Sequence, residues 1–259
     1  MTGEPVTTLD YSPAPGAAPT GRRIRNHALT EANLLVRNGE QLLLALVIPI
    51  AFLVAGRWFG PQLDLDFDTL APGVMALAIW STCFTSVAIS VGFERRYGVL
   101  ERLSPTPLGR GGLLLGKALA LVLVSLGQLA ILAIIALALG WRPQGGVLPT
   151  VVMLATVVLG GIAFAGLGML LGGTLRAEVT LGLANLIYLV LLMVGAVVLP
   201  VASYPALVQP VVALLPTAAV GESLRAWSQG AVSWGSLVVG LVWSVLAVLT
   251  ARKAFRWTS

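Results

Sequence analysis

The chain has 259 residues, of which 57% are hydrophobic and 10% are charged, and its formal net charge is +5. Long apolar runs with so few charges are typical of membrane proteins and exclude an ordinary soluble domain. The basic balance does not indicate nucleic-acid binding, because Lys and Arg gather at the ends of hydrophobic runs rather than along one soluble face. The single cysteine, Cys83, lies inside an apolar run, which excludes a disulfide framework and a thiol metal site.

The N-terminal region divides into two parts. Residues 1–21 are rich in Pro, Ala, Gly and Thr without apolar periodicity, which predicts a disordered cytoplasmic tail. Residues 22–38 carry apolar side chains at helical spacing with basic ones between them. This pattern favours an amphipathic helix on the inner membrane surface, the alternative being a plain basic flank for the first span. Asn38-Gly39 should end this helix, because both residues tolerate the left-handed conformation.

Residues 39–259 predict an all-α membrane domain with six spans, each near the roughly 20 residues that cross a bilayer. The predicted spans are 41–59, 72–92, 113–139, 148–171, 181–201 and 234–252. Pro49 should kink the first of them.

The distribution of Lys and Arg predicts the orientation. With both termini in the cytoplasm, thirteen of the 16 basic residues fall inside and three, Arg57, Arg142 and Arg225, fall outside. The inner residues are Arg22, Arg23, Arg25, Arg37, Arg95, Arg96, Arg102, Arg110, Lys117, Arg176, Arg252, Lys253 and Arg256. This bias predicts a multi-pass protein of the cell membrane with a cytoplasmic loop over residues 93–112.

The stretch 202–233 is too apolar for a free loop, yet Pro205, Pro210 and Pro216 break it into pieces too short to span. Short re-entrant or outer-surface helices satisfy both facts, provided that the broken backbone is buried in protein or faces water. The last piece, 216–227, predicts an amphipathic helix with Glu222 and Arg225 exposed.

Ionisable groups are missing from the middle of every predicted span. Arg57 and Lys117 lie close to span ends, where long side chains reach the interface. Residues 111–118 have the Gly and Lys spacing of a phosphate-binding loop, but Ala118 takes the required hydroxyl position and the segment opens a span. The sequence therefore predicts that this chain does not hydrolyse ATP and binds no cofactor itself.

The loop 93–112 is the densest polar stretch between two spans. Residues 93–103 can form a short helix, and Pro105 and Pro107 should end it and stiffen the return to the third span. Such a helix can fit a cleft on a soluble partner, although its arginines could also serve only to fix topology. The predicted contact residues are Glu94, Arg95, Arg96, Tyr97, Gly98, Glu101, Arg102, Pro105 and Pro107.

Residues 94–103, the Thr106-Pro107-Leu108 turn and Gly116-Lys117 resemble the cytoplasmic loop of ABC-2 type permeases, the membrane subunits of ABC exporters. Arg96 stands where that family often has an acidic residue. The resemblance extends to the surface helix, the six spans, the cytoplasmic termini and the Pro-rich outer stretch.

The resemblance implies a transport subunit that moves an amphipathic substrate, such as a drug-like compound, a lipid or a lipid-linked glycan, out of the cytoplasm or inner leaflet. The implied partners are a cytoplasmic ABC ATPase subunit, which holds ATP and Mg, a second permease copy or close homologue, and membrane lipids.

Two alternatives belong to other classes. A membrane-embedded lipid-modifying enzyme would need convergent acidic residues, for which Asp64, Asp66 and Asp68 are the candidates, although their alternation with apolar residues favours a solvated edge. A passive channel would need a polar helix face to line its pore.

Overall fold

A computed structural model describes residues 16–255, except residues 38, 64 and 104. Throughout this range the secondary structure is helical, with no strand. Six helices are long and apolar enough to cross a membrane, over 45–62, 67–96, 111–138, 147–174, 177–194 and 234–254. The prediction of an all-α protein with six spans is therefore confirmed. The tail predicted over 1–21 falls mostly outside the described residues.

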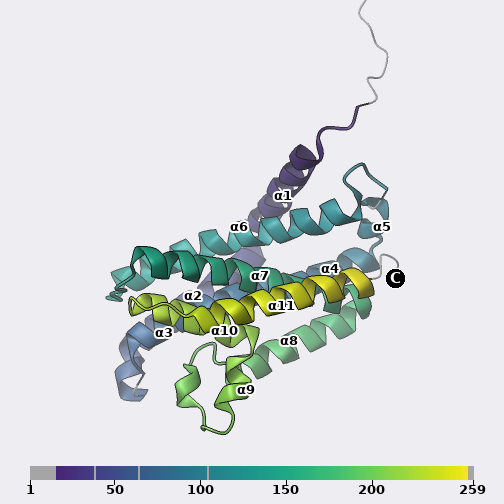
Figure 1. Ribbon diagram of the computed structural model, residues 1–259. Helices are drawn as coiled ribbons and strands as arrows, with labels where there is room; N and C mark the ends of the chain where they lie inside the picture. Colours follow the sequence, from purple (N-terminus) through teal and green to yellow (C-terminus); the bar gives the residue numbers. More distant parts are fainter. Residues whose placement is uncertain (1–15, 38, 64, 104, 256–259) are drawn as a thin grey trace, which may run out of the picture.

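The helices follow one another in chain order (Figure 1). They are α1 (Thr20–Arg37), α2 (Gly39–Phe59), η1 (Gly60–Leu63), α3 (Phe67–Trp80), the π-helical turn η2 (Ser81–Thr85), α4 (Ser86–Arg96), α5 (Val99–Leu103), α6 (Gly109–Ala138), α7 (Val147–Thr174), α8 (Ala177–Val194), η3 (Val201–Ser203), α9 (Gln209–Ala213), α10 (Pro216–Ser228) and α11 (Trp234–Ala254). The second span is thus a composite of α3, η2 and α4.

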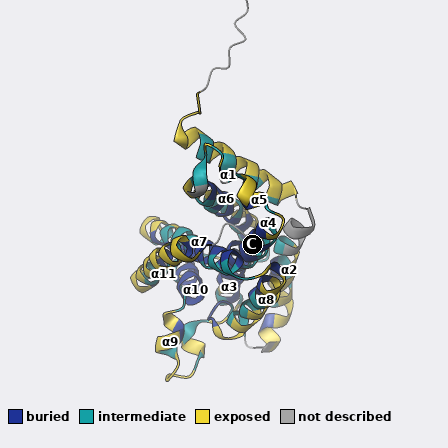
Figure 2. Ribbon diagram, turned by 90° about the vertical axis from the view of Figure 1, so that its right-hand side faces the viewer, coloured by how far each residue is buried: buried dark blue, intermediate teal, exposed yellow. Residues whose placement is uncertain are grey.

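The core lies where α3, α4, α7 and α10 meet, and Figure 2 shows the buried residues gathered there, with exposed residues on α1, α8, α9 and α11. α7 approaches α4 closely because it carries glycine at the contact. A Cβ at Gly168 would lie 2.7 Å from the Phe84 carbonyl oxygen, and one at Gly172 would lie 2.5 Å from that of Ala88. These two glycines therefore serve packing within the chain.

The bundle has two ends. The end that holds α5 and the C-terminal end of α11, at the right of Figure 1, is called the loop end. The opposite end is called the α10 end. At the loop end α1 crosses α6 steeply, and His27 of α1 lies against Gly116. α1 thus forms where the amphipathic helix is predicted, two residues earlier than expected.

The fifth span is shorter than predicted. α8 begins at Ala177 and ends at Val194, and the Gly195 backbone caps it by donating to the Leu191 carbonyl. Residues 195–200 leave the helix, whereas the sequence predicts a span over 181–201. Ala196 takes a φ of +49°, which few residues other than glycine adopt. Contacts from α10, described below, hold this bent segment.

Candidate functional site

The loop 93–112 is two short helical pieces joined by a turn. α4 ends at Arg96, Gly98 takes a φ of +69°, and α5 runs from Val99 to Leu103. The single helix predicted over 93–103 is therefore wrong, because the left-handed conformation of Gly98 ends one helix before the next begins. After α5, Thr106 closes the predicted proline turn by donating its hydroxyl to the Leu103 carbonyl at 2.6 Å. α6 begins at Gly109.

At the base of the loop, two arginines contact the neighbouring helices. Arg95 is buried and donates to the carbonyl of Leu175, where α7 ends. Arg96 is half exposed and pairs with Glu178 in the first turn of α8. Both residues therefore attach the loop to the junction between α7 and α8. The sequence predicts them as partner contacts, but it does not reveal Leu175 as the acceptor for Arg95 or Glu178 as the ion-pair partner of Arg96.

The carboxylate of Glu94 lies in a buried ion cluster. The Lys117 ammonium donates to Glu94 at 2.8 Å and to Glu31 at 3.0 Å, and Lys117 is only 9% exposed. His27 lies 3.8 Å from Glu31 on the same helix. Lys117 thus bonds to carboxylates of two other helices, and it lies inside helical α6 rather than in a phosphate-binding loop. The cluster joins α1, α4 and α6, which come from three separate parts of the chain.

The tip of the loop consists of exposed residues on an anchored helix. Tyr97 is 65% exposed, and Leu100 is buried and fixes α5 to the bundle. Also exposed are Glu101, Arg102, Pro105 and Pro107 on the tip, and Arg96 at the base of the loop. Of the nine predicted contact residues, the structure thus places five on the tip, Gly98 in the turn, and Glu94, Arg95 and Arg96 in contacts with other helices.

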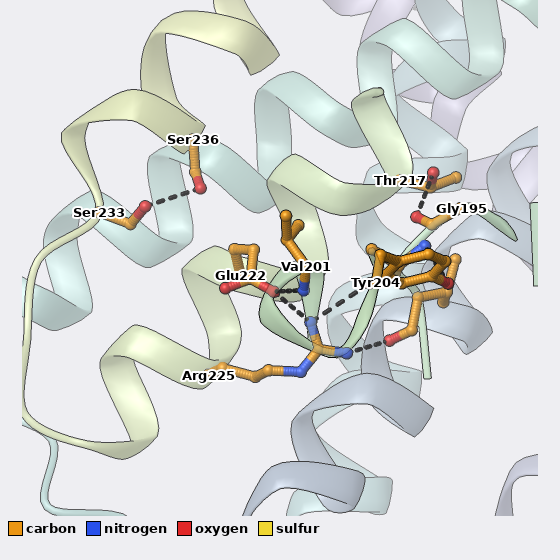
Figure 3. Close-up of polar contacts among 10 residues, drawn as sticks. Gly195, Val201, Tyr204, Thr217, Glu222, Arg225, Ser233 and Ser236 are labelled. Carbon is orange, nitrogen blue, oxygen red and sulfur yellow. Dashed lines mark hydrogen bonds and ion pairs between the residues drawn. The ribbon is translucent and has the colours of Figure 1, made fainter. Parts of the chain in front are cut away.

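The α10 end has its own buried cation, Arg225, shown in Figure 3. One terminal nitrogen donates to the Ala196 carbonyl at 3.2 Å and to Glu222 at 2.9 Å, and the other donates to the Val197 carbonyl at 2.5 Å. Glu222 also accepts from the Val201 backbone at 2.9 Å. Arg225 is 3% exposed, so the prediction that it is exposed is wrong. The reason is that α10 lies among α3, α7 and α11 instead of facing water.

These contacts satisfy backbone groups that the broken fifth span leaves open. Thr217 donates to the Gly195 carbonyl at 2.8 Å, and the Tyr204 hydroxyl donates to the Met193 carbonyl at 3.1 Å. Irregular backbone is tolerated at membrane depth only when protein groups or water pair with it. Burial lowers the pKa of Arg225, and the Glu222 carboxylate partly opposes this shift. The guanidinium remains charged because its ordinary pKa is far above neutrality.

The acidic loop between the first two spans builds no metal site among the described residues. Asp66 caps α3 by accepting from the Thr69 backbone at 3.1 Å, and Asp68 accepts from the Arg142 backbone at 3.4 Å. Asp64 lies outside the described residues. Nothing in the described part of the chain favours the lipid-modifying enzyme.

Comparison with known proteins gives matches over most of the chain. The family profile described as ABC-2 type transporter matches residues 20–227. A Mycobacterium tuberculosis protein named "Probable doxorubicin resistance ABC transporter permease protein DrrC" is 25% identical over 240 residues, which cover 89% of this chain and 87% of the relative. An Escherichia coli protein named "Probable multidrug ABC transporter permease YbhR" is 31% identical over 124 residues, which cover 46% of this chain and 32% of the relative.

Proposed function

Because this chain belongs to the ABC-2 type transporter family, we propose that it is the membrane permease subunit of an ABC exporter and moves an amphipathic substrate outward. ATP and Mg belong to a separate ABC ATPase subunit, so this chain transports and does not catalyse. The observation that carries the proposal is the construction of the loop 93–112. Its exposed tip is anchored by Leu100, and its base is bonded to α6, α8 and the end of α7, and through Lys117 to α1.

This construction suits the transmission of force. A movement of the ATPase against the tip pushes α5, which cannot yield alone because Leu100 is buried. The push passes through Glu94 and Lys117 to α1 and α6, and through Arg95 and Arg96 to the junction of α7 and α8. All these contacts lie at the loop end, so the bundle is displaced at one end first.

The proposal places the loop end in the cytoplasm, in line with the thirteen-to-three bias of basic residues. An impermeant thiol reagent should reach a cysteine placed at Asp66 or Ala206 in intact cells, and one placed at Gly98 only after lysis. Cys83 is buried and should give little background. Labelling of position 98 in intact cells would reverse the orientation.

The substrate class follows from the walls of the bundle and from the relatives. The spans offer mainly apolar surface, which suits a molecule with a large apolar part. The relatives' names refer to doxorubicin resistance and to multidrug transport. We therefore favour a drug-like compound over a lipid or a lipid-linked glycan, transported by two permease copies or by this chain with a close homologue.

The test measures both the partner and the energy source. The chain should co-purify with an ABC ATPase subunit, and inside-out vesicles holding both should accumulate doxorubicin when ATP is added. Uptake should survive a proton uncoupler, since the described spans carry no mid-membrane carboxylate. Uptake driven by a pH gradient without nucleotide would contradict the proposal.

Glu101→Ala tests whether the tip makes the contact. The side chain is exposed on α5, and a charge-assisted hydrogen bond to a partner is worth about 1.5–3 kcal/mol, or about tenfold or more in affinity. Arg142→Ala, at the α10 end, is the matched control and should bind the ATPase normally. Wild-type binding by Glu101→Ala would remove this residue from the interface.

A further inference from the structure

Two spans are interrupted inside the membrane segment. Pro49 lies within α2 and has no backbone N–H, so the carbonyl four residues earlier, that of Ala45, loses its helical partner. In the second span, the turn Ser81–Thr85 is π-helical, a local distortion that frequently marks a place of function. Each interruption is a point at which its span can bend.

A single side chain of the third span bonds to both interruptions. Gln128 of α6 donates to the Ala45 carbonyl at 2.6 Å and accepts from the Thr82 hydroxyl at 2.8 Å. Gln128 is buried at 5% exposure. A primary amide supplies a donor and an acceptor from one short planar group, so glutamine fits this double contact. Next to it, the Cys83 sulfur lies 3.1 Å from the Ser125 hydroxyl of α6.

Because α6 is continuous, it connects the loop end to the contacts of Gln128. α6 runs unbroken for 30 residues, with Lys117 near the loop end and Gln128 about two thirds of the way along. At Lys117 it is tied to α1, which directly precedes α2, and to α4, which follows the π-helical turn. A push at the loop end therefore tilts α6 together with the near halves of its two neighbours. The first and second spans can follow this tilt only by bending. The interruption in each of them lies where Gln128 bonds to it, at the Ala45 carbonyl and at Thr82.

We propose that Gln128 is a positioning residue for transport, which fixes α6 at a shared pivot and makes the first two spans bend together at Pro49 and at Ser81–Thr85. This inference rests on the proposed function, since it assumes that force enters at the loop end. The pivot couples the loop end to the α10 end by keeping the two bends at one level of the membrane.

The experiment separates a pivot from a simple need to pair the Ala45 carbonyl. Gln128→Leu removes both hydrogen bonds and should lower the melting temperature and doxorubicin transport. Pro49→Ala restores an N–H at position 49 and gives the Ala45 carbonyl its own helical partner. The double variant P49A/Q128L should therefore regain the part of the melting temperature that the unpaired Ala45 carbonyl costs, while the Thr82 hydroxyl still lacks its Gln128 acceptor.

Transport by the double variant distinguishes a pivot at Gln128 from a simple need to pair the Ala45 carbonyl. If Gln128 is the pivot, the double variant is stable and binds the ATPase but transports less doxorubicin per ATP hydrolysed than the wild type, as does Pro49→Ala alone. Recovery of both stability and transport by the double variant would show that Gln128 only satisfies a backbone group, and would overturn the proposal. Normal transport by Gln128→Leu alone would overturn it as well.

Thr156→Val is the matched control. Thr156 is equally buried, but its hydroxyl donates to the Val152 carbonyl of its own helix at 2.9 Å and joins no second span. This variant should keep the wild-type ratio of transport to hydrolysis. ATP-driven transport by the wild type must be measured in parallel, because its absence would contradict the proposed function, whereas its presence with unaffected Gln128 variants contradicts only the pivot.

Discussion

Lys117 at the loop end and Arg225 at the α10 end are both buried cations, but different groups neutralise and bond them. Lys117 pairs with carboxylates of two other helices, Glu31 and Glu94. Arg225 pairs with Glu222 on its own helix and with two backbone carbonyls of the bent segment after α8. Lys117 therefore joins its neighbours through side-chain charges, whereas Arg225 bonds irregular backbone through its planar guanidinium.

This difference matters for motion. Ion pairs between separate helices can re-form after the helices shift, because each partner is a flexible side chain. Backbone carbonyls held by one planar group allow fewer geometries. We therefore expect the loop end to rearrange during a transport cycle and the α10 end to keep its shape until force reaches it.

Lys117→Met should have the largest effect on stability. It leaves Glu31 and Glu94 close together without a cation, and breaking a buried ion pair in this way costs about 3–5 kcal/mol. The free energy of unfolding in detergent measures the loss, and Lys253→Met, an exposed lysine at the same end, is the control.

Neutralising all three charged groups, Lys117, Glu31 and Glu94, separates their contribution to stability from their contribution to transport. A triple variant with Lys117→Met, Glu31→Gln and Glu94→Gln should regain part of the lost stability, since no unpaired charge remains. Its transport should stay low, because the tie between α1, α4 and α6 is gone. A triple variant with wild-type transport would show that the charges at the loop end do not transmit force.

Replacing Arg225 by lysine and Lys117 by arginine should lower stability less than Lys117→Met does, and the two replacements should differ in their cost. Arg225→Lys keeps the charge but loses the planar fork that bonds Ala196, Val197 and Glu222, which should cost about 1–3 kcal/mol. Lys117→Arg keeps a donor for both carboxylates and should cost less. Thermal unfolding of both variants checks this order, and an Arg225→Lys variant as stable as the wild type would show that the planar guanidinium is not needed at the α10 end.

The sequence predicts the parts of this structure that local composition imposes. Apolar runs of span length must be helical in a membrane, and charges with prolines mark the loop, so the six spans and the family resemblance are both confirmed. The role of the tip residues and the orientation of the chain stay predictions.

Pairing between distant residues was not visible in the sequence. Lys117 and Glu31 lie 86 residues apart, and no local pattern indicates that α1 crosses α6 at this place. The π-helical turn Ser81–Thr85 has no sequence signature, and Gln128 reads as an ordinary polar residue of a span until Ala45 and Thr82 are placed beside it. The sequence predicts an exposed Arg225 because a polar helix face ordinarily meets water, whereas this face of α10 meets broken backbone.

The smallest loss of stability should come from Glu222→Gln. Comparing it with Glu94→Gln tests whether the loop end depends more on charge than the α10 end. The amide oxygen at position 222 can still accept from the Val201 backbone and from Arg225, which also keeps its two carbonyls. Because Glu222 is partly exposed and lies three residues from Arg225 on one helix, the loss should stay below about 1 kcal/mol. Glu94→Gln removes a charge-assisted bond between two helices and should cost about 1.5–3 kcal/mol. The measurement is the free energy of unfolding of the two variants, which we expect to be lower for Glu94→Gln than for Glu222→Gln. Equal losses would mean that the two ends hold their cations in the same way, and that the loop end is no more dependent on charge than the α10 end.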